Sequence, residues 1–197
     1  MKDTTKMLPN TLKCLLHNTQ DLFLFMDKYK DEIVHELTEP KWQMLSTSLL
    51  PNKNLKKLLA LKETYKAHDP DILLLIEVGG SESLNNFNKY FLDDAYEVFT
   101  SASNSDRGID LGFMVKKEIA SFFEFSAYVD NLLSNQKKFS RGVFELKLKK
   151  EEEIKMIFLL THLKSKLNLK KLDFEGRGQR QAETMELAKI YQSLKMK

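Results

Sequence analysis

Residues 70–80 constrain the fold more than any other stretch of this 197-residue sequence. Five apolar residues, 72–76, run without interruption and follow the turn-forming sequence Asp-Pro-Asp. An uninterrupted apolar run of this length is typical of a β-strand that is buried on both faces. Glu77 comes directly after the run, and two glycines follow at positions 79 and 80. The sequence therefore predicts a buried strand with a carboxylate at its carboxyl end.

The carboxylate of Glu77 has two interpretations. A buried and unpaired carboxylate costs several kcal/mol or becomes protonated, so a compensating charge is expected. Carboxylate oxygens are hard ligands that suit Mg²⁺, and a divalent cation at the edge of the sheet would supply that charge. The alternative is that Glu77 faces solvent at a strand end and binds nothing. The strand pattern alone leaves both interpretations open.

The composition is that of an ordinary globular protein, with 42% hydrophobic and 30% charged residues. We expect one domain over residues 1–197, with a flexible segment at residues 1–10. The net charge of +3 does not indicate a nucleic-acid protein, but it is compatible with a phosphate-bearing substrate. Cys14 is the single cysteine, which excludes a disulfide framework within the chain. With no signal-peptide pattern and no apolar run of ~20 residues, we expect a cytoplasmic protein.

The apolar spacing predicts a mixture of helices and strands. Apolar residues recur at helical spacing between positions 22 and 37, which predicts a helix there. Glu39-Pro40 is expected to stop that helix. Residues 51–54 are a plausible start for a helix that ends before Pro70. A second buried strand is expected at residues 156–160, and a final helix at 181–194 has Ala182, Met185, Ala188, Tyr191 and Leu194 as candidate inward positions. Other expected elements are a strand at 11–16 broken by 17–20, a helix at 81–92, and strands at 96–100, 109–115, 122–129 and 143–148. The fold class is α/β in the broad sense, or α+β, with antiparallel hairpins in part of the sheet structure.

Polar side chains lie at or just after the ends of several predicted strands: Asn18, Glu77, Asp110, Arg141 and His162. Strand ends of an α/β core are where ligands usually bind. An amide and a carboxylate offer oxygen ligands for one Mg²⁺, and a histidine offers acid or base function near neutral pH. An arginine offers a fixed charge and a forked donor that suits phosphate. Together these groups indicate metal-assisted hydrolysis of a phosphoester.

The polar and basic residues in these segments also have structural explanations when each is considered by itself. His162 fits a structural hydrogen-bonding histidine, and Arg141 fits a surface or ion-pairing arginine. Lys164 and Lys166 fit solvated loop lysines, and Arg107, before Gly108, fits a turn residue.

Five segments, taken in chain order, resemble the endonuclease/exonuclease/phosphatase superfamily, which has the DNase-I-like fold. The most specific are Pro-Asp-hydrophobics-Glu at 70–78, Arg-Gly-Ile-Asp at 107–110 and His-Leu-Lys-Ser-Lys at 162–166. The other two are the Asn-containing segment at 17–23 and Phe-Ser-Arg-Gly at 139–142. The matches span the chain from about Leu12 to Leu194.

The resemblance implies a sandwich of two β-sheets flanked by helices, with Glu77 as the ligand of Mg²⁺ or Mn²⁺. It implies catalytic roles for His162, Asn18 and Arg141. It assigns substrate binding to Arg107, Asp110, Lys164 and Lys166.

The sequence also departs from the pattern of that superfamily. Gln20 stands where many members carry a carboxylate. The later motifs Gly-Asp-Phe-Asn and Ser-Asp-His do not occur in these 197 residues. We therefore expect a fold that lacks its C-terminal third, and a chain with little or no activity by itself.

The leading functional hypothesis is a Mg²⁺-dependent phosphodiesterase, most simply a DNA or RNA endonuclease or exonuclease. A phosphatase that acts on a phosphoinositide or another small phosphoester is the alternative within the enzyme class. A catalytically inactive half-domain that binds a partner is the alternative outside it. Unpaired sheet edges would support that last hypothesis, because they invite self-association.

Overall fold

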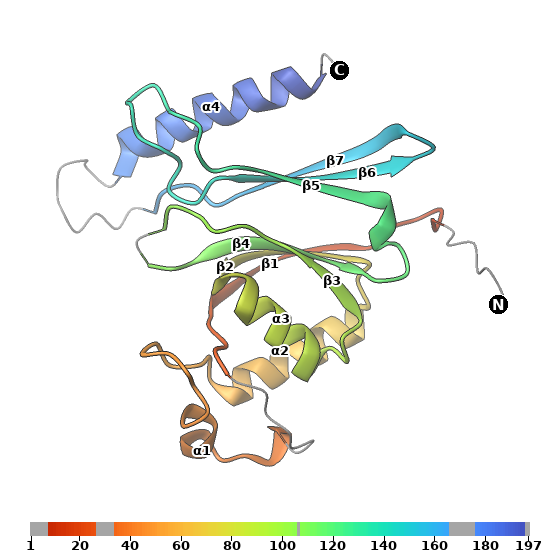
Figure 1. The fold of residues 1–197 in the computed structure, drawn as a ribbon, viewed down its shortest axis with the longest axis vertical. Helices are drawn as coiled ribbons and strands as arrows, with labels where there is room; N and C mark the ends of the chain where they lie inside the picture. Colours follow the sequence, from red (N-terminus) through yellow and green to blue (C-terminus); the bar gives the residue numbers. More distant parts are fainter. Residues whose placement is uncertain (1–7, 27–33, 106, 166–175, 196–197) are drawn as a thin grey trace.

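The computed structural model describes residues 8–26, 34–105, 107–165 and 176–195. Two β-sheets stack face to face, and helices cover both outer faces (Figure 1). The first sheet has the order β1-β2-β4-β3 and the second has the order β5-β6-β7. The strands are β1 (Cys14–Leu22), β2 (Ile72–Val78), β3 (Tyr96–Phe99), β4 (Asp110–Lys116), β5 (Phe123–Tyr128), β6 (Val143–Lys150) and β7 (Glu153–Thr161). The predicted α+β class, with two sheets flanked by helices, is confirmed.

The predicted buried strand is β2, which lies inside the first sheet. It pairs in parallel with β1 and antiparallel with β4. Its side chains alternate between two cores, as strand geometry requires. Leu73 and Leu75 pack in the core between the sheet and the helices, whereas Ile72, Leu74 and Ile76 belong to the core between the two sheets. The uninterrupted apolar run is explained because both faces of β2 are covered.

The outer face of the first sheet is covered by α2 (Leu55–His68) and α3 (Gly80–Phe91). Asn54 caps α2, since its side chain accepts a hydrogen bond from the Lys57 backbone N–H at 3.3 Å. Tyr65 of α2 and Phe87 of α3 meet edge to face, with ring centroids 6.0 Å apart. Both predicted helices are thus present, and each ends within two residues of its expected limits.

The second sheet is covered by α4 (Arg177–Lys195), whose Ala182 and Ile190 pack on Val143 of β6. Two expectations in this region are wrong. Strand β7 is an edge strand rather than a doubly buried one, and its Met156 is 47% exposed. Met185, Ala188 and Tyr191 of α4 also face solvent, because the sheet contacts a narrower stripe of the helix than the spacing suggested.

The N-terminal part differs from the prediction. Strand β1 begins at Cys14 and continues to Leu22, so residues 17–20 do not end it. Its pairing with β2 is nevertheless irregular between Asn18 and Leu22. The helix expected at 22–37 is wrong at its start, because Met26 forms a β-bridge with Ser46. Residues 27–33 lie outside the described residues, as do residues 1–7 of the segment expected to be flexible. Three short helices are also present: the 3₁₀ helices η1 (Val34–Glu36) and, later in the chain, η2 (Ala120–Phe122), and the α-helix α1 (Glu39–Gln43). Glu39 and Pro40 lie in the first turn of α1, so a new helix starts where the pattern of 22–37 was expected to stop.

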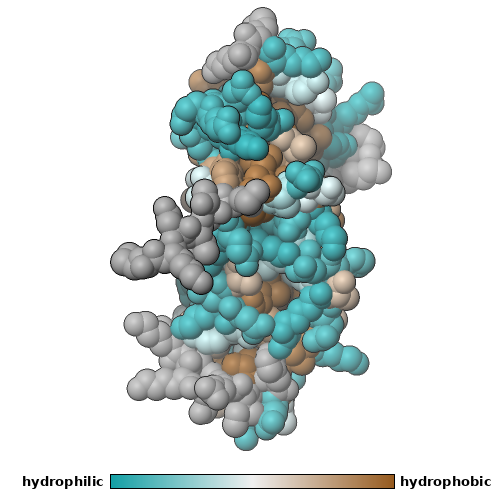
Figure 2. All heavy atoms as spheres, turned by 90° about the vertical axis from the view of Figure 1, so that its right-hand side faces the viewer, coloured by the Kyte–Doolittle hydropathy of each residue, from teal (hydrophilic) through white to brown (hydrophobic). Residues whose placement is uncertain are grey.

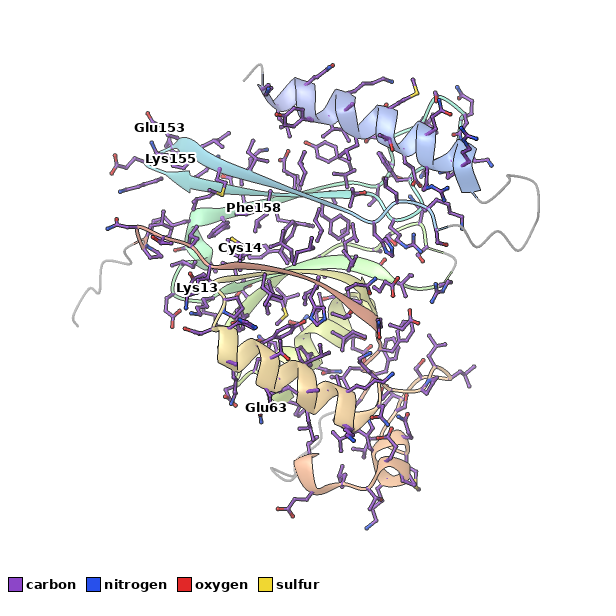
Figure 3. All side chains as sticks on the ribbon, turned by 180° about the vertical axis from the view of Figure 1, so that it is seen from behind. Lys13, Cys14, Glu63, Glu153, Lys155 and Phe158 are labelled. Carbon is purple, nitrogen blue, oxygen red and sulfur yellow. The ribbon has the colours of Figure 1, made fainter. Side chains whose placement is uncertain are left out.

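Both sheets leave edge strands, and β1 and β7 lie on the same side of the molecule. Figure 3 shows Cys14 on β1 and Phe158 on β7 at this side. Leu16 of β1 is 66% exposed here. Figure 2 shows the face of the molecule on which the turn between β6 and β7 lies. This face is mainly hydrophilic and has small apolar patches. Within the described ranges, none of the helices is long and apolar enough to cross a membrane.

Candidate active site

The end of β2 is distorted in a way that brings Glu77 out of the alternation. Strand β4 pairs Ile76 with Leu111 and Val78 with Asp110, so Glu77 is an extra residue on β2. Its φ of +62° is the left-handed conformation that often accompanies such a bulge. Val78 returns to the core under the helices, the side that Glu77 would otherwise occupy. The bulge therefore keeps the carboxylate out of the apolar core.

His162 follows β7 of the second sheet and meets Glu77 from the opposite layer. Its Nε2 lies 3.7 Å from Oε1 of Glu77, which is an electrostatic contact rather than a hydrogen bond. Burial lowers the pKa of His162 below 6.5, and Arg141 lowers it further, while Glu77 opposes both. Burial and Arg141 therefore favour the neutral form of the imidazole. Its Nδ1 is buried and has no hydrogen-bond partner among the described residues.

Arg141 precedes β6 and is 5% exposed. Its Nη1 donates to the backbone oxygens of His162 and Leu163, each at 3.3 Å. These bonds join the start of β6 to the segment that leaves β7. Burial lowers the pKa of Arg141, and the carboxylates of Glu77 and Glu183 oppose this shift, yet a guanidinium stays charged in proteins. A fixed positive charge therefore lies beside the Glu77–His162 pair.

Glu183 of α4 anchors the segments that carry Arg141 and His162. The sequence patterns did not identify this residue. The side chain is 1% exposed. Its oxygens accept hydrogen bonds from the backbone N–H groups of Ser140, at 2.8 Å, and Lys164, at 2.7 Å. Gln179 donates a third bond through Nε2 at 3.2 Å. Because Ser140 precedes Arg141 and Lys164 follows His162 by two residues, one carboxylate fixes both segments.

Arg107 and Asp21 form an ion pair at the exposed rim of the same region. Nη2 of Arg107 lies 3.0 and 3.2 Å from the two carboxylate oxygens of Asp21. About half of the Arg107 side chain and two fifths of the Asp21 side chain are exposed. The sequence patterns did not identify Asp21, although it directly follows Gln20, the position at which the resemblance implies a carboxylate. The charge of Arg107 is therefore paired with Asp21. It also lies close enough to Arg141 to lower the pKa of Arg141.

Asn18 and Asp110 flank Glu77 on the neighbouring strands. Asn18 of β1 pairs with Ile76 and is exposed, and its Oδ1 accepts the Gln20 N–H at 2.9 Å. Asp110 of β4 pairs with Val78 and accepts the Ser103 N–H at 3.1 Å. Burial raises the pKa of Asp110, whereas the hydrogen bonds from Ser103 lower it. The strand pairing thus brings both residues to the sheet end that carries Glu77.

Lys164 and Lys166 follow His162 in the chain. Lys164 is half-buried, and its backbone bonds Glu183 and Arg180, whose Nη1 donates to the Lys164 oxygen at 3.1 Å. Lys166 lies outside the described residues.

The oxygen donors at this end of the sheet can be compared with the needs of Mg²⁺. That ion keeps several waters and is usually held by one or two carboxylates. Glu77 offers one carboxylate, and Asn18 offers an amide oxygen on the next strand. In the described ranges, no group of three or more His, Cys, Asp or Glu side chains is arranged to hold a metal. The donors therefore fit a largely hydrated Mg²⁺ or Mn²⁺ on Glu77 and do not fit an ion enclosed by protein ligands.

No family model matches this sequence. No curated protein matches it either. Similar solved structures include TDP2 from Caenorhabditis elegans, at 22% sequence identity and a TM-score of 0.47, which covers 71% of this chain and 38% of that chain. A truncated TDP2 from Caenorhabditis elegans gives 22% identity and a TM-score of 0.45, with coverage of 71% and 49%. This chain thus spans less than half the length of either.

Proposed function

We propose that this chain carries the metal- and phosphate-binding part of a Mg²⁺-dependent phosphodiesterase, with DNA or RNA as the substrate and residues 1–197 acting as one domain. The supporting observation is the convergence of Glu77, Arg141 and His162 from the two sheets, with Nε2 of His162 3.7 Å from Oε1 of Glu77. A carboxylate, a guanidinium and a neutral imidazole are the groups that metal-assisted phosphodiester hydrolysis uses.

Each group has a distinct proposed role. Glu77, assisted by Asn18, would hold Mg²⁺ or Mn²⁺, and the bound ion would supply charge stabilisation to the phosphate oxygens. Arg141 would bind the negatively charged phosphate, and its burial would strengthen that attraction. His162 would donate a hydrogen bond from Nε2–H to a phosphate oxygen and so stabilise the charged transition state, which a neutral imidazole can do. If it instead protonates the leaving oxygen, it must first take up a proton and act as the imidazolium. Arg107, Asp110, Lys164 and Lys166 would position the substrate around these groups.

A phosphatase acting on a phosphoinositide or another small phosphoester would use the same three groups.

The alternative outside the enzyme class, a half-domain that binds a partner, is favoured by the two edge strands on one side of the molecule. Leu16 on β1 and Met156 on β7 expose apolar surface next to unpaired backbone groups, and a second copy of the chain would cover both. Sedimentation of the purified protein over a range of concentrations tests this self-association.

The phosphodiesterase hypothesis is tested by calorimetric titration of Mg²⁺ into the wild-type protein and Glu77→Gln. Binding is measured because the sequence predicts little turnover. The substitution keeps the shape of the side chain and removes its charge, so Mg²⁺ binding should be lost. Glu97→Gln, on the exposed edge strand β3, is the matched control and should bind as the wild type does. Unchanged Mg²⁺ binding by Glu77→Gln would contradict the hypothesis.

A further inference from the structure

Lys53 lies at the rim of the candidate site although no sequence motif pointed to it. It precedes α2, and its Nζ donates to the backbone oxygen of Gln20 at 2.8 Å. Gln20 and Asp21 belong to the last part of β1, where both residues have positive φ. Lys53 is therefore attached to the strand end that lies beside Glu77.

The backbone around Lys53 is held by several hydrogen bonds. The Lys53 N–H donates to the Phe23 oxygen at 2.7 Å, and Trp42 Nε1 donates to the Lys53 oxygen at 2.9 Å. The preceding residue, Asn52, is 3% exposed and accepts the Phe25 N–H at 2.8 Å. Trp42 is fully buried. On this fixed backbone, the hydrogen bond from Nζ to the Gln20 oxygen holds the ammonium beside the end of β1.

The ammonium of Lys53 has donors to spare. It carries three N–H donors, and Gln20 is the one acceptor found for them in the described part of the chain. Within those same ranges, no carboxylate lies within ion-pair distance of Lys53. Burial and the neighbouring charge of Lys57 lower the pKa of Lys53, and the charges of Asp21 and Glu77 oppose this shift. Its charge is thus near the site and is not neutralised by direct contact.

We propose that Lys53 binds a phosphate of a nucleic-acid backbone next to the phosphate held by Arg141 and His162. This inference rests on the proposed function and makes it more specific. A nucleic acid presents a phosphate at the regular backbone spacing on each side of the reacting one, whereas a small ester with a single phosphate presents none. Lys53 would therefore favour a polymeric substrate and set the direction in which it crosses the end of β1.

The test is the salt dependence of binding to a short fluorescein-labelled oligothymidylate, measured by anisotropy in EDTA over a series of KCl concentrations. Each lost phosphate contact lowers the slope of log Kd against log[KCl] by about 0.7 for a single strand. We expect this decrease in Lys53→Gln and expect Lys53→Arg to restore the wild-type slope. Lys66→Gln is the matched control: it makes the same charge change at the far end of α2, where Lys66 pairs with Asp93 at 2.9 Å, and should keep the slope.

Two results would overturn the inference. One is a wild-type slope in Lys53→Gln, including the case in which only its thermal midpoint falls, because Lys53 would then merely support β1. The other is a failure of the wild-type protein to bind the oligonucleotide. Because this assay contains no free metal, neither result depends on Mg²⁺ binding at Glu77. Failure of the proposed function would instead appear in the calorimetric comparison with Glu77→Gln.

Discussion

Replacing Glu183 should disturb the candidate site and the stability of the protein together. In Glu183→Ala the part-buried backbone N–H groups of Ser140 and Lys164 lose acceptors at 2.8 and 2.7 Å. A fully buried donor left unsatisfied costs about 1–3 kcal/mol, and because water partly reaches these two, we expect about 1–3 kcal/mol for both together. Glu183→Gln keeps one acceptor oxygen and turns an NH₂ group toward the other N–H. It should cost about half as much.

These losses can be measured by urea denaturation, followed through the fluorescence of Trp42, the single tryptophan. The site itself can be followed through the ring resonances of His162, which should shift because the segment after β7 is released. Glu186 of the same helix provides the control. It accepts one bond from Asn131, at 3.3 Å, and pairs with Lys189, so Glu186→Ala should cost less than about 1 kcal/mol.

The tethering role of Glu183 would be refuted by equal destabilisation of Glu183→Ala and Glu186→Ala. It would also be refuted by unchanged His162 resonances in a folded Glu183→Gln.

Three further outcomes are expected. The lowered pKa of His162 means that the unfolded chain binds more protons below pH 6.5, so the free energy of unfolding should decrease as the pH falls through that value. His162→Gln should make this decrease smaller in pH-dependent urea titrations, and an unchanged decrease would contradict it. Phe144→Ala removes a ring from the core between the sheets and should cost about 3–5 kcal/mol by denaturation, whereas a loss below 1 kcal/mol would mean that the sheets do not pack there. The 197-residue protein should show little Mg²⁺-dependent cleavage of plasmid or single-stranded DNA; turnover that disappears in His162→Ala would overturn that expectation.

The sequence by itself determined the elements whose cause is local. The apolar run at 72–76 specified a strand covered on both faces, and the turn residues 51–54 indicated the start of α2, which Asn54 caps in the structure. The polar residues that follow such patterns, among them Glu77 and His162, could be named as candidates because strand ends are visible in the sequence. Where the pattern depended on partners, it failed. The apolar composition of β7 did not show that one of its edges is unpaired, and the spacing of α4 did not show how narrow its buried stripe is.

Only the tertiary structure decided the geometry of the site. The bulge at Glu77 depends on how β4 pairs with β2, and the Asp21–Arg107 ion pair joins residues 86 positions apart. Glu183 and Lys53 resemble any surface glutamate or lysine in the sequence. Their importance comes from backbone groups of segments that are distant in the chain and adjacent in space. Contacts of this kind depend on long-range packing, which a local pattern of residues does not encode.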